Sequence, residues 1–283
     1  MSKTTTLPVP AAATAAARLP ATLRVGWSRA VLETRMFFRE RDSLIFTFSF
    51  PVVLLVLFGS IFRGEFEDSG VSVSQLYAAG LIGAGLMSVS FQNLAIAIAV
   101  EREDGTLKRL AGTPMPPAAY FVGKVLSVLL AAVLEVALLL AVGVLLYDLE
   151  PPADAARWAT FAWVFVLGLA ACSLLGIAFS SLPRSAKSAS AVVTLPFVAL
   201  QFVSGVFIPF AELPQWVTHL ASLFPLRWMC QGFRSVFLGD AGAALELTGS
   251  YELDRVALIL AAWTVGGLLL CLKTFRWTSR REG

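Results

Sequence analysis

Charge is scarce in this chain. Only 14% of its 283 residues are charged, 57% are hydrophobic, and the mean hydropathy is +0.76. Average soluble domains carry roughly a quarter charged residues, which they need to cover a water-exposed surface. We therefore predict that membrane lipid surrounds much of the protein. The net charge of +3 is too small to indicate a nucleic-acid partner, and we expect none.

Residues that bind metals or form disulfides are also few. The three cysteines, Cys172, Cys230 and Cys271, have neither the spacing of a metal site nor an evident disulfide partner. The single histidine, His219, has no second metal ligand near it in the sequence. We therefore expect neither a metal nor a cofactor in this chain.

A nucleotide-binding loop is missing as well. Such a loop needs the pattern Gly-x-x-x-x-Gly-Lys-Ser/Thr, whose backbone amides surround the phosphates. The only Gly-Lys pair, Gly123–Lys124, is followed by Val125 and lacks the earlier glycine. If ATP drives this protein, we expect a separate polypeptide to bind it.

Acidic residues are rare inside the long apolar runs, where Glu135 in "LLAAVLEVALLLAVG" is the one clear example. A charged carboxylate at that depth costs on the order of a few kcal/mol, so it should face protein or water, or be protonated. Two interpretations remain open: a substrate or proton contact, and a hydrogen-bonded residue between helices. Because no partner base or metal accompanies it, we do not expect the chain to be an enzyme.

What the sequence has in abundance is apolar runs long enough to cross a bilayer, which takes about 20 residues. Six such runs lie near 44–62, 75–100, 125–147, 158–182, 189–210 and 256–275. They must be helical, because lipid offers no hydrogen-bond partner to an open strand edge. They also lack the alternation of outer-membrane strands. The predicted fold class is an all-α membrane protein with six transmembrane helices.

The distribution of Lys and Arg predicts the orientation of these helices. The N-terminal arm, the second and fourth connections and the C-terminal tail together hold seventeen of these residues, and the other three connections hold five. Cytoplasmic segments carry the excess of positive charge. We therefore predict a multi-pass protein of the cell membrane with both termini in the cytoplasm.

The N-terminal arm divides into two parts. Residues 1–22 are rich in Ala, Thr and Pro and are predicted to be a disordered cytoplasmic tail. From Leu23 to Asp42, apolar residues recur every three or four positions, with arginines elsewhere on the helical wheel. This period favours a helix lying in the headgroup layer, its arginines toward anionic lipid. A simple positively charged anchor is the alternative.

The stretch "EREDGTLKRL", Glu101–Leu110, gathers charge between two apolar runs. A short helix can restart after Gly105, with Asp104 or Thr106 near its cap, and Leu107 and Leu110 would share one face. The prolines that follow would end it. We predict a short stiff helix that transmits force between a soluble partner and the membrane, with Leu107 and Leu110 filling an apolar groove of that partner. An ordinary charged loop is the alternative.

Two separated segments of the chain also carry recognisable motifs. The first has Arg102, Glu103, Gly105, Thr106, Leu107, Leu110, Thr113, Pro114, Tyr120, Gly123 and Lys124. The second has Ser204, Gly205, Phe207, Pro209, Leu213, Pro214, Trp216, Phe224, Pro225, Leu226 and Arg234. In these residues the chain resembles the membrane subunits of ABC-2 type ABC transporters, including the daunorubicin-resistance-like exporters.

The resemblance implies an ABC-2 type transmembrane domain over residues 23–283. In that family two membrane subunits, often a homodimer, pair with two copies of a cytoplasmic ABC ATPase, which binds ATP and Mg. The residues implied to couple to the ATPase are Glu101, Glu103, Gly105, Thr106, Leu107 and Leu110. Short outer helices that re-enter the membrane are implied between Pro209 and Gly239, marked by Pro209, Pro214, Trp216, Pro225 and Arg234.

The contact between two copies has two candidates in the sequence. Gly80 and Ala84 form a small-x-x-x-small pair, which permits close helix packing either between copies or within one copy. The fifth span, with Ser204 and Gly205, is the other candidate.

The predicted function is therefore that of a permease subunit that exports a hydrophobic or amphipathic compound, such as a drug, a secondary metabolite or a lipid. Topology alone leaves import open. The alternative is a membrane scaffold or sensor that keeps the fold without transport.

Overall fold

The computed structural model describes residues 18–62, 64, 70–147, 149–208, 210–275 and 277. Most of the predicted disordered tail, residues 1–17, and Pro209 lie outside these described residues. Over the described part of the chain the secondary structure is helical, as predicted for an all-α protein.

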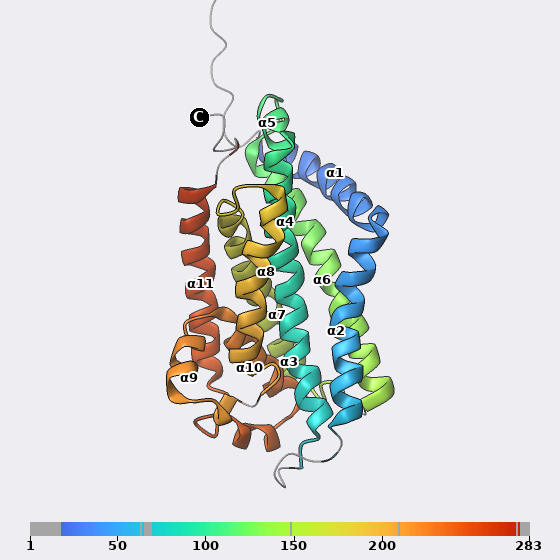
Figure 1. Cartoon of the computed structure of the whole chain (residues 1–283), viewed down its shortest axis with the longest axis vertical. Coiled ribbons are helices and arrows are strands. Elements are labelled where there is room, and N and C mark those ends of the chain that lie inside the picture. The colour runs from blue at the N-terminus through green and yellow to red at the C-terminus, as the bar shows by residue number, and fades with distance from the viewer. Residues whose placement is uncertain are drawn as a thin grey trace, which may run out of the picture.

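Six helical segments are long and apolar enough to cross a membrane, which confirms the predicted number of spans. They are α2 (Arg41–Ile61), α3–η2–α4 (Val73–Met87, Ser88–Asn93 and Leu94–Glu103), α6 (Pro117–Tyr147), α7 (Ala155–Phe179), α8 (Ala186–Val203) and α11 (Leu253–Thr274). In Figure 1 these helices run side by side along the long axis of the molecule.

Two span boundaries differ from the prediction for physical reasons. Helix α6 begins at Pro117 rather than near Val125, because Lys124 is paired with carboxylates and does not have to leave the helix. Helix α8 ends at Val203 rather than near Phe210, because the chain turns at Gly205, where φ is +79°. That left-handed conformation costs glycine little.

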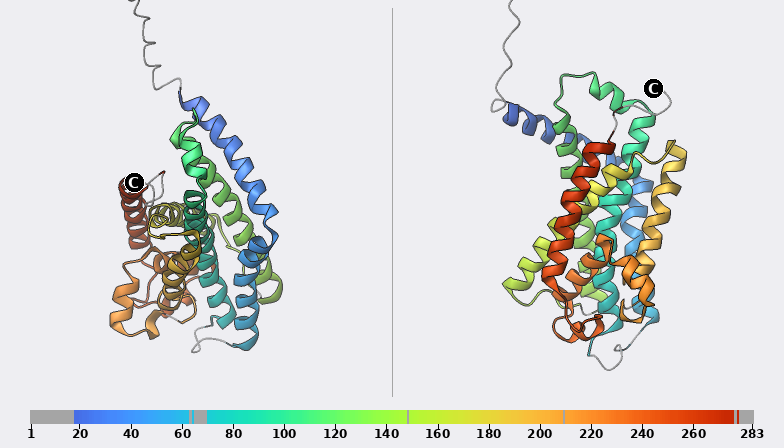
Figure 2. Two further views of the ribbon diagram at one scale, coloured as in Figure 1. Left: turned by 45° about the horizontal axis from the view of Figure 1, so that its top comes forward. Right: turned by 90° about the vertical axis from the view of Figure 1, so that its left-hand side faces the viewer.

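The short elements gather at the two ends of the bundle. Helices α1 (Arg18–Arg39) and α5 (Thr106–Ala111) lie at the end that we call the α5 end, together with the C-terminal end of α11 (Figure 1). The opposite end, the α9 end, holds η3 (Phe210–Glu212), α9 (Gln215–Ala221), α10 (Pro225–Phe237) and η4 (Ala241–Leu245). Figure 2 shows α1 leaving the bundle at a steep angle.

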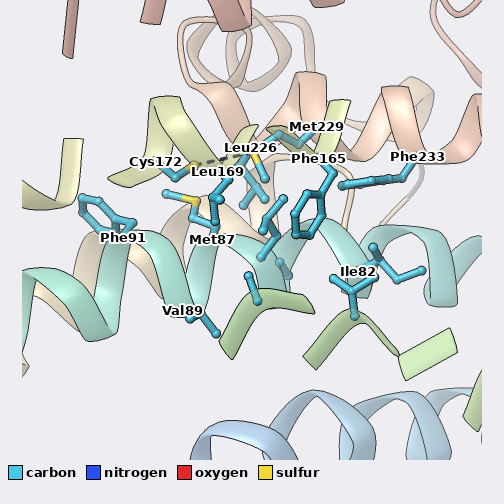
Figure 3. Packing of buried hydrophobic residues seen from close by; sticks show 14 of the residues in the cluster. Ile82, Met87, Val89, Phe91, Phe165, Leu169, Cys172, Leu226, Met229 and Phe233 are labelled. Atoms are coloured by element: carbon cyan, nitrogen blue, oxygen red, sulfur yellow. Dashed lines mark hydrogen bonds between the residues drawn. The ribbon is translucent and has the colours of Figure 1, made fainter. Parts of the chain in front are cut away.

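The core is built around α3, whose residues from Leu76 to Met87 are all buried. Helix α10 packs between α3 and α7, where Met229 contacts Cys172 and lies near Leu169 and Met87 (Figure 3). Small residues make this contact possible: a Cβ at Gly83 would lie 3.1 Å from Cys230 Sγ.

The small pair of α3 also packs within the subunit. A Cβ at Gly80 would lie 3.0 Å from the Val206 carbonyl oxygen, and Ala84 is buried. Ser204 and Gly205 are internal too, since Ser204 is buried and the Gly205 carbonyl accepts a hydrogen bond from Arg234. For Gly80 and Ala84 the alternative of packing within one copy is therefore correct. Ser204 and Gly205 do not reach a second copy either, but other residues of the fifth span, such as Leu195 and Phe202, are exposed, so that span stays a prediction.

The second span contains a π-helical turn, η2, between α3 and α4. The widened turn approaches α7 closely, because a Cβ at Gly176 would lie 2.9 Å from the Phe91 carbonyl oxygen. Two side chains of η2 form hydrogen bonds to other spans: Gln92 Nε2 donates to Thr194 Oγ1 of α8 at 2.8 Å, and Asn93 Nδ2 donates to Thr47 Oγ1 of α2 at 3.2 Å. Such π-turns are frequent at functional sites.

Helix α1 begins at Arg18, earlier than the predicted Leu23, and packs along α6. Its apolar residues Leu23 and Trp27 are exposed, as expected for a helix that meets lipid. Arg29 differs from the prediction, because it turns inward rather than toward lipid headgroups. A Cβ at Gly123 of α6 would lie 2.6 Å from Arg29 Cγ, so the glycine leaves room for this side chain.

Candidate functional site

The predicted coupling segment folds as two helix ends joined by a tight turn. Glu101 and Glu103 belong to the last turn of α4, and the chain reverses at Gly105, where φ is +77°. The carboxylate of Asp104 accepts a hydrogen bond from the Thr106 backbone amide at 2.8 Å and so caps α5. Arg109 Nη2 donates to Thr106 Oγ1 at 3.0 Å. The segment is therefore a fixed structure and not an irregular loop.

The two leucines of α5 face the subunit itself. Leu107 is 0% exposed within the main hydrophobic cluster, and Leu110 packs against that cluster. The expectation that both fill an apolar groove of a partner is wrong. A short helix with one apolar face turns that face toward the bundle, since burying a leucine contributes about 1.5–3 kcal/mol. The exposed residues of the segment are instead Glu103, Asp104, Lys108 and Arg109, and residues 111–114 after it are exposed as well.

The end of α4 is hydrogen-bonded to the ends of two other spans. The Arg102 guanidinium donates to the carbonyl oxygen of Ser180, and its Nη2 lies 3.1 Å from Ser180 Oγ at the end of α7. The Glu103 carboxylate accepts a hydrogen bond from the backbone amide of Ala186, the first residue of α8. A carboxylate is favourable at a helix N-terminus, where backbone amides lack partners.

Glu101 enters a buried group of charges that we call the ion-pair cluster: Arg29 and Glu33 of α1, Glu101 of α4, and Tyr120 and Lys124 of α6. Lys124 Nζ lies 2.7 Å from Glu33 Oε2 and 2.7 Å from Glu101 Oε1. Arg29 Nη2 lies 2.5 Å from Glu33 Oε1 and 3.6 Å from Glu101 Oε1. The Tyr120 hydroxyl donates to Glu101 Oε2 at 2.8 Å.

The charges of the ion-pair cluster balance, with two cations facing two carboxylates. Its side chains are almost enclosed, with between 5% and 13% of each charged side chain exposed. Removing one partner of such a buried pair is strongly destabilising, because the other charge is left uncompensated. The cluster therefore joins α1, α4 and α6 directly beneath the turn that leads into α5.

Comparison with known proteins identifies the family. A family profile described as ABC-2 type transporter matches residues 27–238, which is most of the chain. The chain belongs to the ABC-2 type transporter family. The exposed α5 segment and the bonds that attach it to the spans are thus parts of an ABC transporter membrane subunit.

Two relatives of this ABC-2 permease come from Escherichia coli K12. The inner membrane transport permease YadH is 26% identical over 225 residues, which covers 76% of this chain and 85% of YadH. YbhR, named as a probable multidrug ABC transporter permease, is 26% identical over 147 residues, which covers 52% of this chain and 39% of YbhR. The match to YbhR therefore spans less than half of that relative.

In this permease Glu135 is fully buried on α6 and faces α3. A Cβ at Gly85 would lie 2.8 Å from Glu135 Oε1, so the carboxyl group occupies the space left by that glycine. Neither oxygen of Glu135 has a hydrogen-bond partner among the described protein groups. The structure thus places the residue between two helices, but without the hydrogen bond between helices that the second interpretation requires among the described groups. A substrate or proton contact stays a prediction.

The predicted re-entrant segment forms short helices at the α9 end. Pro214 precedes α9, Trp216 is 71% exposed on α9, and Pro225 is the first residue of α10. Arg234 holds this part of the permease together: its Nε lies 2.6 Å from Glu246 Oε1, and its Nη1 donates to the Gly205 carbonyl at 2.9 Å.

A tyrosine forms two hydrogen bonds at the same end of the permease. The Tyr251 hydroxyl donates to the Gly239 carbonyl at 2.7 Å, and the Tyr251 carbonyl accepts from Gln231 Nε2 at 2.7 Å. Burial, followed by the nearby carboxylate of Glu246, raises the pKa of Tyr251. The hydroxyl therefore stays protonated and can keep donating at physiological pH.

Tyr120 and Lys124 are motif positions and Glu101 belongs to the predicted coupling segment, but no sequence pattern indicated Arg29 and Glu33 as their partners. Glu33 and Lys124 lie 91 residues apart, so no local spacing connects them. The signal that could have found the pair is the lysine itself, because a cation in an apolar helix needs a carboxylate from elsewhere.

Proposed function

We propose that this permease exports a hydrophobic or amphipathic compound with energy from a separate ABC ATPase that docks at the α5 end. Two copies of the ATPase, carrying ATP and Mg, would serve a homodimer of this chain. The α5 end and both termini would face the cytoplasm, as the excess of Lys and Arg there favours. The multidrug assignment in the name of YbhR supports export of a drug-like compound.

The observation that carries the proposal is the attachment of α5 to the ends of several spans. Its outer surface is exposed and polar, whereas the residues just before it bind α7 through Ser180, α8 through Ala186, and α1 and α6 through the ion-pair cluster. A displacement applied to α5 by a soluble partner would therefore reach these four helices. An ordinary loop would absorb such a displacement.

The experiment uses the exposed side of α5. Leu107→Asp would put a carboxylate into the hydrophobic cluster, so it cannot separate docking from folding. We expect Lys108→Glu to reduce the ABC ATPase that co-purifies with the full chain by roughly two- to tenfold, since exposed charges at an interface mainly orient the partners. The measurement is co-purification, together with ATP hydrolysis in the same membranes.

The matched control is Lys273→Glu, an exposed lysine at the same end of the bundle on α11. It should leave co-purification at the wild-type level. Wild-type association and hydrolysis in Lys108→Glu would contradict docking at α5. The ATPase could also associate normally with the wild-type chain while its ATP hydrolysis responds to none of the compounds tested. That result would favour the scaffold or sensor.

A further inference from the structure

A cavity of about 620 Å³ lies between α2, α3, α8 and the segment that follows α8, toward the α9 end. Half of the residues in its wall are aromatic. The rings that line it are Phe50, Phe58, Phe62, Tyr77, Phe202 and Phe207. Phe50, Phe62 and Phe202 are also exposed on the subunit surface, so the cavity opens to the outside of the subunit.

The rings form a continuous surface. Phe58 stacks on Tyr77 with ring centroids 5.0 Å apart and an interplanar angle of 23°. Phe207 lies 5.3 Å from Phe58 and 5.2 Å from Phe202, which extends the surface from α2 to α8. Aromatic faces carry negative charge density, so they attract a flat apolar body and, in particular, a cation.

One polar side chain in the wall has no protein partner. Gln201 lines the cavity, and its side-chain amide makes no hydrogen bond to another described residue. The amide atoms are not among the enclosed side-chain atoms that lack a partner, so they are accessible from the cavity. A bound molecule with a donor or acceptor at this position would form a hydrogen bond with the amide.

Among the described residues, the charged side chain that lines the cavity is an acid. Glu212 lines it and is exposed, and among the described residues no lysine or arginine forms an ion pair with Glu212 or lines the cavity. The carboxylate therefore gives the opening a negative potential, which favours a positively charged molecule over a negatively charged one.

We propose that this cavity binds an amphipathic organic cation. The aromatic body of the ligand lies against the Phe58 and Phe202 rings, a polar group bonds to Gln201, and the positive charge lies toward Glu212. A small number of polar groups in a mostly apolar cavity is the usual composition of a small-molecule site. The inference rests on the proposed export function, whose substrate class it names.

The cavity is also connected to the α5 end. Its two flanking spans, α2 and α8, both accept hydrogen bonds from the π-turn η2, through Thr47 and Thr194. The π-turn continues into α4 and then into α5. A shift of α4 would therefore act on both walls of the cavity, which is what release of a bound compound requires.

The test measures dye binding to the full chain in lipid nanodiscs by fluorescence anisotropy, without any ATPase. Rhodamine 123 supplies a cationic xanthene, and fluorescein methyl ester supplies a xanthene without the cation. We expect Glu212→Gln to weaken rhodamine binding by about two- to fivefold, as for an exposed charge pair, and not to weaken binding of the fluorescein ester, whose xanthene is anionic at neutral pH. Gln201→Leu and Phe202→Ala should weaken rhodamine binding by about five- to tenfold.

The controls remove matched residues outside the cavity. Glu150→Gln removes another exposed acid beyond the lining of the cavity, and Phe38→Ala removes an exposed ring on α1 that does not line it. Both variants should bind rhodamine 123 like the wild type. Because Glu212, Phe38 and Phe202 are exposed, substituting these three residues removes no core side chain, whereas Gln201 is buried.

Equal binding of the two dyes, binding of neither, or rhodamine binding that none of the three cavity variants weakens would overturn the proposal. Crosslinking of Phe202→Cys to a second copy, with no dye bound, would assign the cavity to the contact between copies instead. None of these results depends on the ATPase. Co-purification therefore still tests the docking of the ATPase at α5 independently of the cavity.

Discussion

Lys124 lies in one of the most apolar helices of the chain, and its charge is tolerated because two carboxylates lie 2.7 Å from its Nζ. The same group of charges holds α1 against the bundle, although α1 itself exposes much of its apolar side. Single residues in this permease thus combine two roles, since they satisfy a buried charge and fix the position of a helix near the α5 end.

Lys124→Ala tests this role, because it leaves the carboxylates of Glu33 and Glu101 with Arg29 as their only cation in the cluster. Loss of one partner in a buried ion pair costs about 3–5 kcal/mol. We expect the melting temperature of the purified chain to fall by roughly 5 °C or more in a thermal-shift measurement. The control Lys187→Ala, at an exposed lysine, should change it little.

A compensating substitution sharpens the test. Lys124→Ala combined with Glu33→Gln removes one cation and one carboxylate together, so the cluster keeps its charge balance. The double variant should recover part of the lost stability relative to Lys124→Ala alone. A double variant less stable than the single one would show that charge balance is not what Lys124 contributes.

Among the elements, α5 depends most on a single backbone conformation. Gly105 takes φ of +77° to reverse the chain between α4 and α5, and a Cβ there would meet only Arg109 Nη1, at 3.7 Å. Space is therefore available at this position, and the limit is the left-handed conformation itself. That conformation is easy for glycine, possible for asparagine and unfavourable for alanine.

We expect Gly105→Ala to destabilise the turn by about 1–2 kcal/mol and to reduce ATPase co-purification, because the exposed side of α5 loses its fixed position. Gly105→Asn should retain more of the association. Gly112→Ala at the other end of α5 is the control, because Gly112 has φ of −79° and its Cβ would make only ordinary contacts. If Ala and Asn at position 105 behave alike, the conformation of the turn is not what docking requires.

For the whole molecule, the arrangement of the ends matters most. The start of α1, the α5 segment and the end of α11 lie at one end, and the α9–α10 helices lie at the other (Figure 1). The protein crosses the membrane several times, and the imbalance of seventeen basic residues against five predicts that the α5 end is cytoplasmic.

Cysteine labelling in intact cells measures this orientation. In a background without native cysteines, Glu150→Cys should react with an impermeant maleimide, whereas Lys187→Cys should react only after the membrane is permeabilised. Both positions are exposed in the subunit, so accessibility to the reagent depends on the side of the membrane. Labelling of Lys187→Cys but not Glu150→Cys in intact cells would reverse the assignment.

The sequence predicted only part of the candidate site. Gly105 and the cap at Asp104 follow from local rules, since both act within a few residues of the chain. The direction in which Leu107 points does not, because a six-residue helix with one apolar face can turn that face to a partner or to its own bundle. The sequence alone was compatible with an apolar face turned to a partner, whereas in the packed structure that face is turned to the bundle.

The amino-acid sequence by itself determined the helical class, the six spans and the family of this permease. Hydropathy over about 20 residues is a local property, and lipid leaves the backbone no alternative to the helix within a span. Only the tertiary structure decided that Gly80 and Ala84 pack internally, that Glu33 pairs with Lys124, and that Gln201 and Glu212 share one cavity. The contacts of Gly80 with Val206 and of Glu33 with Lys124 join residues far apart in the chain, and they exist because shape and charge are satisfied among several helices at once.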